Sequence, residues 1–198
     1  MMTFTDMTWL NPPPSHRVEP DQLTITTGPA TDFWRGTFYG FTRHSGHHLA
    51  HPVTGDFTAR VTITADYQAL YDQAGLMLRL SDTHWIKAGI EHTDGQPVFS
   101  TVVTNTHSDW ATLPLPFPAS PLTLRLTRHA EAIRVDVQEP SGLWRMARLA
   151  YLPPSTDVSG PAMIGPMACS PEREGFTATF TQYTCGPAIP RTLHEQQP

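Results

Sequence analysis

The chain has 198 residues, of which 39% are hydrophobic and 16% are charged, and its formal net charge is −5. This length suits one domain with one core, and the negative charge gives no electrostatic support to nucleic-acid binding. No apolar run approaches membrane length and the first residues lack the anatomy of a signal peptide, so we expect a cytoplasmic protein with no membrane partner.

The two cysteines, Cys169 and Cys185, are too few to form a disulfide framework. We expect both to be free thiols, as is usual in the cytoplasm. Neither has a neighbouring Cys-x-x-Cys or base motif, so thiol catalysis is not expected.

In the first part of the chain, apolar residues that alternate with polar ones predict strands at residues 23–27 and 56–64. Between them lies a loop-like segment, residues 31–41, with five aromatic side chains: Phe33, Trp34, Phe38, Tyr39 and Phe41. A histidine-rich loop follows, with His44, His47, His48 and His51.

Residues 71–104 are the most informative stretch, because three alternating runs are joined there by two turns. Asp94-Gly95, in the second turn, is the strongest short signal for a hairpin with a type I′ turn. This turn sets Lys87 opposite Val102 in the next strand. A slip of one residue would mix the polar and apolar faces, so the register is strongly specified.

The first turn, at residues 81–83, aligns the preceding strand independently. With three residues in this turn, Gln73 lies opposite Glu91. Both turns then place the apolar residues of the three strands on one face of the sheet and the polar residues on the other. One face is apolar and predicts the core. On the other face, a row with almost no side chains predicts the floor of a groove: Gly75, Gly89 and Ser100.

Prolines within residues 113–121 indicate an extended crossover after these strands. Further alternation predicts strands near residues 122–127, 133–138, 143–151, 160–167 and 176–180. About ten strands, one core and no helical period predict an antiparallel β-sandwich of the jelly-roll type. We expect residues 1–185 to form this single domain and residues 186–198 to be a polar tail.

Six short motifs occur in one order along the chain: DFW at 32–34, YDQAGLMLR at 71–79, WIKAGIE at 85–91, VVT at 102–104, SDW at 108–110 and CSP at 169–171. With them the chain resembles a family of domains of unknown function typified by the fungal "regulation of enolase" protein, over roughly residues 7–183. The resemblance implies a concanavalin A-like lectin/glucanase fold and a carbohydrate-related role. It brings no established activity. The histidine-rich loop departs from it, since only Gly46-His47 is expected to be typical.

Sugar binding requires aromatic platforms and planar polar side chains in a groove. The candidate ligand-binding residues are Trp34, Tyr39, Tyr71, Gln73, Lys87, Glu91 and Trp110. We predict that they bind a small polar ligand or glycan, either a carbohydrate or a sugar phosphate, on the concave sheet. The competing interpretation is a solvated, charged outer face whose tryptophans anchor loops. On either interpretation, Lys87 and Glu91 are expected to be exposed and too far apart to pair directly.

Glycoside hydrolysis is a second hypothesis, with Glu91 as the only candidate catalytic residue. A retaining enzyme needs a second carboxyl about 5 Å away, and an inverting enzyme needs one about 6.5–9.5 Å away. Asp72 and Asp109, just beyond strand ends, are the carboxylates that could approach Glu91. We expect no such pair, and therefore a binding protein rather than an enzyme.

The remaining hypotheses concern metals and protein partners. Structural zinc needs four ligands in a firm frame, whereas residues 44–51 are expected to form a solvated loop, so no metal and no cofactor is predicted. The family's name suggests a possible protein partner, which would make the chain a regulator of a central-metabolic enzyme.

Overall fold

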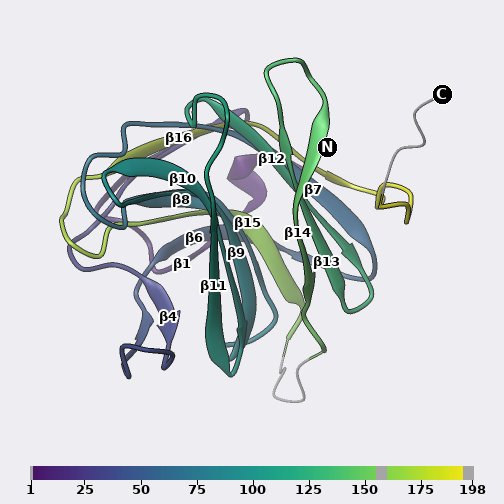
Figure 1. The fold of residues 1–198 in the computed structure, drawn as a ribbon, viewed down its shortest axis with the longest axis horizontal. Coiled ribbons are helices and arrows are strands. Elements are labelled where there is room, and N and C mark those ends of the chain that lie inside the picture. Colours follow the sequence, from purple (N-terminus) through teal and green to yellow (C-terminus); the bar gives the residue numbers. More distant parts are fainter. Residues whose placement is uncertain (1, 155–159, 194–198) are drawn as a thin grey trace.

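The structure, a computed structural model, describes residues 2–154 and 160–193. Two seven-stranded antiparallel sheets face each other, and a small hairpin projects beside the first sheet (Figure 1). The first sheet contains, in spatial order, β1 (Thr8–Leu10), β6 (His47–Val53), β15 (Ala162–Cys169), β8 (Gln73–Arg79), β9 (His84–Thr93), β10 (Gln96–Asn105) and β11 (His107–Leu113). The second sheet contains β14 (Trp144–Tyr151), β13 (Ala132–Gln138), β12 (Leu122–His129), β7 (Phe57–Ala65), β16 (Thr177–Gly186), β3 (Gln22–Thr26) and β2 (Ser15–Val18). The hairpin is β4 (Phe33–Arg35) and β5 (Thr42–His44).

The antiparallel sandwich predicted from the alternation is confirmed. The one helical element among the described residues is the 3₁₀ turn Phe4–Asp6, and no described helix is long and apolar enough to span a membrane. Several strands are additional to the prediction, chiefly β2, β4, β5 and β11. They are short, polar or on a sheet edge, so their sequences lack the clear alternation of a half-buried strand.

Both predicted turns give the expected register. In the β9–β10 pair Lys87 lies opposite Val102, and in the β8–β9 pair Gln73 lies opposite Glu91. The agreement follows from the fixed geometry of a two-residue turn together with the period of the apolar face.

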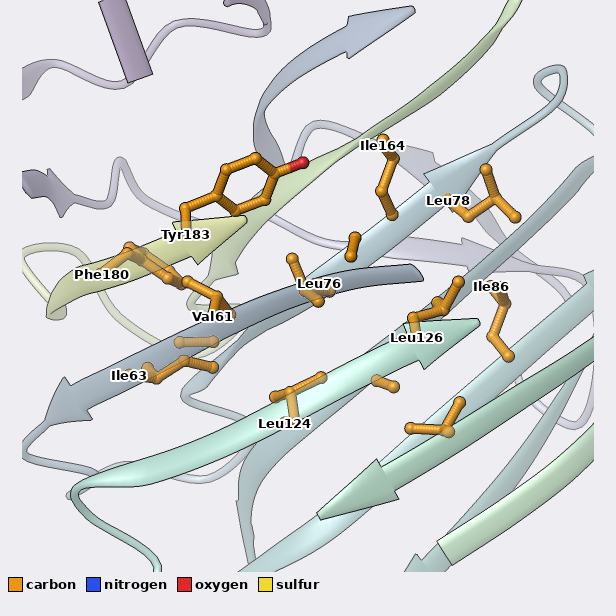
Figure 2. Close-up of a cluster of buried hydrophobic side chains, with 14 of the residues drawn as sticks. Val61, Ile63, Leu76, Leu78, Ile86, Leu124, Leu126, Ile164, Phe180 and Tyr183 are labelled. Carbon is orange, nitrogen blue, oxygen red and sulfur yellow. The ribbon is translucent and has the colours of Figure 1, made fainter. Parts of the chain in front are cut away.

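The main core lies between the two sheets and is formed by aliphatic residues at alternate strand positions (Figure 2). Leu76 and Leu78 of β8 and Val61 and Ile63 of β7 all belong to this core, and all four are at most 1% exposed. Burying each such side chain contributes about 1.5–3 kcal/mol relative to leaving it in water. This core holds β8 and β9 in place, and their opposite faces form the candidate site.

The outer face of the first sheet carries a second apolar cluster: Phe33, Trp34, Met77, Trp85, Val102, Met167 and Cys169. The β4–β5 hairpin supplies Phe33, whose ring meets that of Trp85 edge-on with centroids 6.1 Å apart. The interpretation of this face as solvated is therefore wrong, because the hairpin covers it and buries Trp85 completely.

The histidine-rich segment was expected to be a solvated loop, but most of it is strand β6. His47, His48 and His51 are buried there with hydrogen-bond partners in neighbouring strands and loops. His48 Nε2 donates to the Met77 carbonyl (3.1 Å), and burial lowers the pKa of His48 to about 3. His51 Nε2 bonds the Tyr183 hydroxyl (2.8 Å). The described residues contain no group of three His, Cys, Asp or Glu suited to a metal ion.

Both cysteines are free thiols. The division into a domain at 1–185 and a tail at 186–198 stays a prediction. Part of that tail contacts the second sheet, because Ile189 N donates to Thr58 Oγ1 (3.0 Å) and the Thr192 carbonyl accepts from Arg134 (2.5 Å). Residues 194–198 lie outside the described residues.

Candidate functional site

A cavity of about 260 Å³ lies on the outer face of the first sheet, beside the β4–β5 hairpin. Its walls include all seven side chains assigned to ligand binding from the sequence: Trp34, Tyr39, Tyr71, Gln73, Lys87, Glu91 and Trp110. Six further residues complete the walls: Asp32, Phe41, Arg43, Val102, Pro171 and Glu172. The structure thus brings the predicted set together, and its role in binding stays a prediction.

Lys87 on β9 is the buried cation of this cavity. Its Nζ donates to Asp32 Oδ1 (3.0 Å) and to Gln73 Oε1 (2.6 Å). Burial alone would lower the pKa of Lys87, but attraction to Asp32 and neighbouring acidic groups outweighs burial, so the pKa is raised. The expectation of an exposed lysine is wrong, since the side chain is 4% exposed and fully charged at neutral pH.

Asp32, the partner of Lys87, is the site residue that sequence reasoning missed as a functional group. It directly precedes β4, and its backbone carbonyl accepts from the amides of Ser45 and Gly46, both at 2.9 Å. A Cβ at Gly46 would lie 2.3 Å from the Phe33 ring, so this close approach requires glycine. Asp32 is part of the DFW motif, and that motif was the available signal. Nothing in a loop-like segment predicted that it would fold over Lys87.

Glu91, also on β9, is anchored through one oxygen. Its Oε2 accepts from Ser100 Oγ (2.5 Å) and from Trp110 Nε1 (3.2 Å). The side chain is 6% exposed, again contrary to expectation. Burial raises the pKa of Glu91, whereas the charge of Lys87 and the two hydrogen bonds lower it. Burial is the largest effect, so the pKa is raised overall. Glu91 therefore takes up a proton more readily than an ordinary glutamate.

The raised pKa of Glu91 has a consequence for stability. The folded state binds this proton more tightly than the unfolded state does, so the stabilisation is present at low pH. This stabilisation is lost as the pH rises from near 4.5, the ordinary pKa of a glutamate, through the raised pKa of Glu91 in the folded state. We expect the stability of the wild type relative to Glu91→Gln to fall across this window. Urea unfolding of both proteins between about pH 4 and pH 8 measures the difference, and a pH-independent difference would contradict the assignment.

The two acidic residues that could have approached Glu91 are instead paired with arginines. Asp72 is fully buried against Arg173, whose Nε lies 2.9 Å from Asp72 Oδ1. Asp109 extends toward Arg148, at 3.4 Å. The second buried carboxylate of the cavity is Asp32 instead.

The predicted groove floor also needs correction. Gly75 and Gly89 lie opposite each other as expected, but neither lines the main cavity. Beneath the polar side chains is a separate hollow of about 10 Å³, lined partly by Gly89 and Ser100. That is about the space of one water molecule. The glycines instead allow two strands to approach closely, since a Cβ at Gly89 would lie 2.1 Å from the Ala74 carbonyl oxygen.

We therefore expect Gly89→Ala to destabilise the fold by about 1–3 kcal/mol or more. The added methyl group would clash with the backbone of the neighbouring strand β8, which is held in place by its own pairing in the sheet. Gly186→Ala is the matched control, since a Cβ at this strand residue meets nothing within 4 Å. Chemical denaturation measures both. Equal stability of the two variants would show that the space at Gly89 is open after all.

Aromatic side chains form the walls of the cavity and join its two sides. The hydroxyls of Tyr39, on the hairpin, and Tyr71, before β8, are hydrogen-bonded at 2.9 Å. This bond, the largest cause, raises the pKa of Tyr71 to about 12. Trp34 Nε1 donates to the Thr37 carbonyl (3.0 Å) within the hairpin. The walls therefore combine aromatic faces with hydroxyl groups around the buried charges.

Two solved structures share this architecture, although their sequences have low identity to this chain. Xylan β-1,4-xylosidase from Bacillus halodurans C-125 has a TM-score of 0.66 at 11% identity, covering 83% of this chain and 32% of that one. The lectin from Bauhinia forficata in complex with GalNAc has a TM-score of 0.57 at 11% identity, covering 91% and 92%. At this identity the likeness shows the fold alone, a concanavalin A-like sandwich.

Three further matches are much stronger. "Regulation of enolase protein 1" of Saccharomyces cerevisiae is 43% identical over 188 residues, covering 95% of this chain and 93% of that protein. A crystal structure of a functionally unknown protein from Saccharomyces cerevisiae has a TM-score of 0.89 at 42% identity, covering 96% of this chain and 100% of that one. A family model described as a protein of unknown function, DUF1349, matches residues 9–188. These matches confirm the resemblance seen in the motifs, and the chain belongs to the DUF1349 family.

Proposed function

We propose that the cavity beside the β4–β5 hairpin binds a neutral sugar. The observation that carries the proposal is the convergence of buried polar groups, Lys87, Glu91 and Asp32, with aromatic walls in one cavity. Among the described residues, the donors to the Glu91 carboxylate are Ser100 and Trp110, and both donate to Oε2. Its second oxygen is thus available to accept from a ligand hydroxyl, and such charge-assisted bonds are the strong ones.

The charges around the cavity favour a neutral sugar over a sugar phosphate. The cationic wall residues are Lys87 and Arg43, and the acidic ones are Asp32, Glu91 and Glu172. The ammonium group of Lys87 is already paired with Asp32. A phosphate would meet no surplus of positive charge, whereas hydroxyl groups can donate to carboxylates and accept from the ammonium group.

Calorimetric titration with glucose, galactose, mannose, xylose and their phosphates tests the proposal. We expect one or more neutral sugars to bind, and Glu91→Gln to weaken that binding about 10- to 100-fold, because a hydrogen bond to a charged group contributes about 1.5–3 kcal/mol. Glu19→Gln, which changes an exposed ion pair, should leave the affinity unchanged. Binding of phosphates alone, or of no sugar at all, would contradict the proposal.

Incubation of the protein with oligosaccharides, followed by chromatography of the products, tests for hydrolysis. Glu91, with its raised pKa, and Asp32 are two carboxylates around one cavity. If oligosaccharides are cleaved, and Glu91→Gln abolishes cleavage, the cavity is an active site rather than a binding site. We propose binding, because Asp32 lies in an ion pair with Lys87, 3.0 Å from its Nζ, which holds Asp32 as a structural partner of the lysine.

A second candidate function is a contact with a metabolic enzyme in the cytoplasm. It is supported by the name of the 43% identical relative, "Regulation of enolase protein 1". Sedimentation of the purified protein with purified enolase tests it. Co-sedimentation at micromolar concentration would support the contact, and independent sedimentation would exclude a stable complex.

A further inference from the structure

A second cavity, of about 570 Å³, lies beside the first, between the tip of the β4–β5 hairpin and β11. Its walls are Trp34, Thr37, Phe38, Tyr39, Ser108, Asp109 and Trp110. Three of these, Trp34, Tyr39 and Trp110, also line the first cavity. The two cavities therefore meet along a shared aromatic boundary.

The shared tryptophans present hydrocarbon surface to both cavities. The indole N–H of Trp34 donates to the Thr37 carbonyl (3.0 Å), and that of Trp110 donates to Ser100 Oγ (3.0 Å). With the polar tips fixed in the protein, the ring surfaces remain for contact. Aromatic rings contribute large contact areas with fixed geometry, and the apolar C–H face of a sugar ring matches such a surface.

Phe38 marks the hairpin tip as an outer edge of the second cavity. Its side chain is 93% exposed, and its backbone has φ +62°, a left-handed conformation that is uncommon outside glycine. Its ring lies edge-on to Tyr39 with centroids 5.1 Å apart. The fold gains no core contact from this phenylalanine, so its packing surface is left for a ligand in the adjoining cavity.

Asp109 adjoins the second cavity, but its carboxylate points away from the aromatic rings. Neighbouring residues of a strand point to opposite faces, and Asp109 lies opposite the core residue Val103, whereas Trp110 lies opposite Val102 of the outer apolar cluster. The Asp109 side chain accordingly lies 3.4 Å from Arg148 of the second sheet. The second cavity therefore offers aromatic surface to a ligand.

From this continuity we infer that the ligand is an oligosaccharide of at least two sugar units, one in each cavity. The inference rests on the proposed sugar site and adds the class of sugar. The first cavity, with its buried charges, holds the unit that makes the strong hydrogen bonds. The second cavity holds the neighbouring unit, stacked on the rings of Phe38, Tyr39 and Trp110.

The test compares xylose, glucose, mannose and galactose with xylobiose, cellobiose, maltose, mannobiose and lactose by calorimetric titration of the full chain. We expect the best disaccharide to bind at least about tenfold more tightly than its monosaccharide, since one stacked ring contributes this order of affinity. Phe38→Ala should remove most of this gain and leave the monosaccharide affinity near that of the wild type. Phe38 is exposed, so the variant should fold.

Leu143→Ala is the matched control, an exposed apolar residue between β13 and β14 of the other sheet. It should change neither affinity. Equal affinities for monosaccharide and disaccharide, unchanged by Phe38→Ala, would overturn the inference and leave the single-sugar proposal standing. Absence of binding to every sugar would overturn both. Loss of enolase binding in Phe38→Ala, with sugar affinities unchanged, would assign the second cavity to a protein surface.

Discussion

Replacement of Lys87 by methionine is expected to lower the free energy of unfolding by about 3–5 kcal/mol, although the hydrocarbon stem is nearly preserved. The variant leaves the Asp32 carboxylate without its cation at a site covered by the hairpin. Removing one partner of a buried ion pair is costly because the other charge remains uncompensated. Urea unfolding at neutral pH measures the change.

Two controls separate this explanation from a general effect of mutation. Arg17→Met breaks the exposed Arg17–Glu19 pair, whose arginine side chain is 72% exposed, and should cost only about 0–1 kcal/mol. The double variant Asp32→Asn/Lys87→Met removes both charges and should recover part of the loss, a coupling that a double-mutant cycle measures. Additive effects of the two substitutions would show that the pair is energetically unimportant.

Replacement of Asp72 by alanine is expected to have an effect of similar size. Asp72 is fully buried, pairs with Arg173 and also accepts from the backbone amides of Gln68 and Ala69, both at 3.0 Å. The variant leaves these donors unpaired, and breaking a buried pair costs about 3–5 kcal/mol. It also releases the segment that carries Tyr71, so sugar affinity should fall as well. Denaturation and calorimetry measure the two effects.

The matched control is Asp82→Ala. Asp82 also pairs with an arginine, Arg79, but its side chain is 70% exposed, so we expect a loss of about 0–1 kcal/mol and unchanged sugar affinity. If Asp72→Ala were no more harmful than Asp82→Ala, the buried pair with Arg173 would not be what fixes the wall of the cavity.

The central strands could be predicted because their signals are local and redundant. The Asp94-Gly95 turn and the alternation from Leu76 to Val103 each specify the same register, and the structure has that register. Register in turn places Gln73, Lys87 and Glu91 on one face. The polar centre of the cavity was accessible from the sequence for this reason.

The covering of that face could not be predicted in the same way. The segment around β4 and β5 has no regular alternation, and its position depends on contacts distant in sequence, such as Arg35 N donating to Ser108 Oγ (2.9 Å). As a result, Asp32 was not expected beside Lys87, and charges expected in solvent are buried. The glycine pair was expected to face open space for a related reason: side-chain size was known from the sequence, but strand separation was not.

The sugar site is tested most directly by following the indole N–H signals of the five tryptophans by nuclear magnetic resonance during titration with the sugar that binds best. Trp34 and Trp110 line the cavity, whereas Trp9 and Trp144 lie elsewhere. If the sugar binds in this cavity, the Trp34 and Trp110 signals should show saturable shifts, the Trp9 and Trp144 signals should be unchanged, and Glu91→Gln should abolish the shifts. Saturable shifts confined to Trp9 or Trp144, or no shift with any neutral sugar, would contradict the assignment of this cavity as a sugar site.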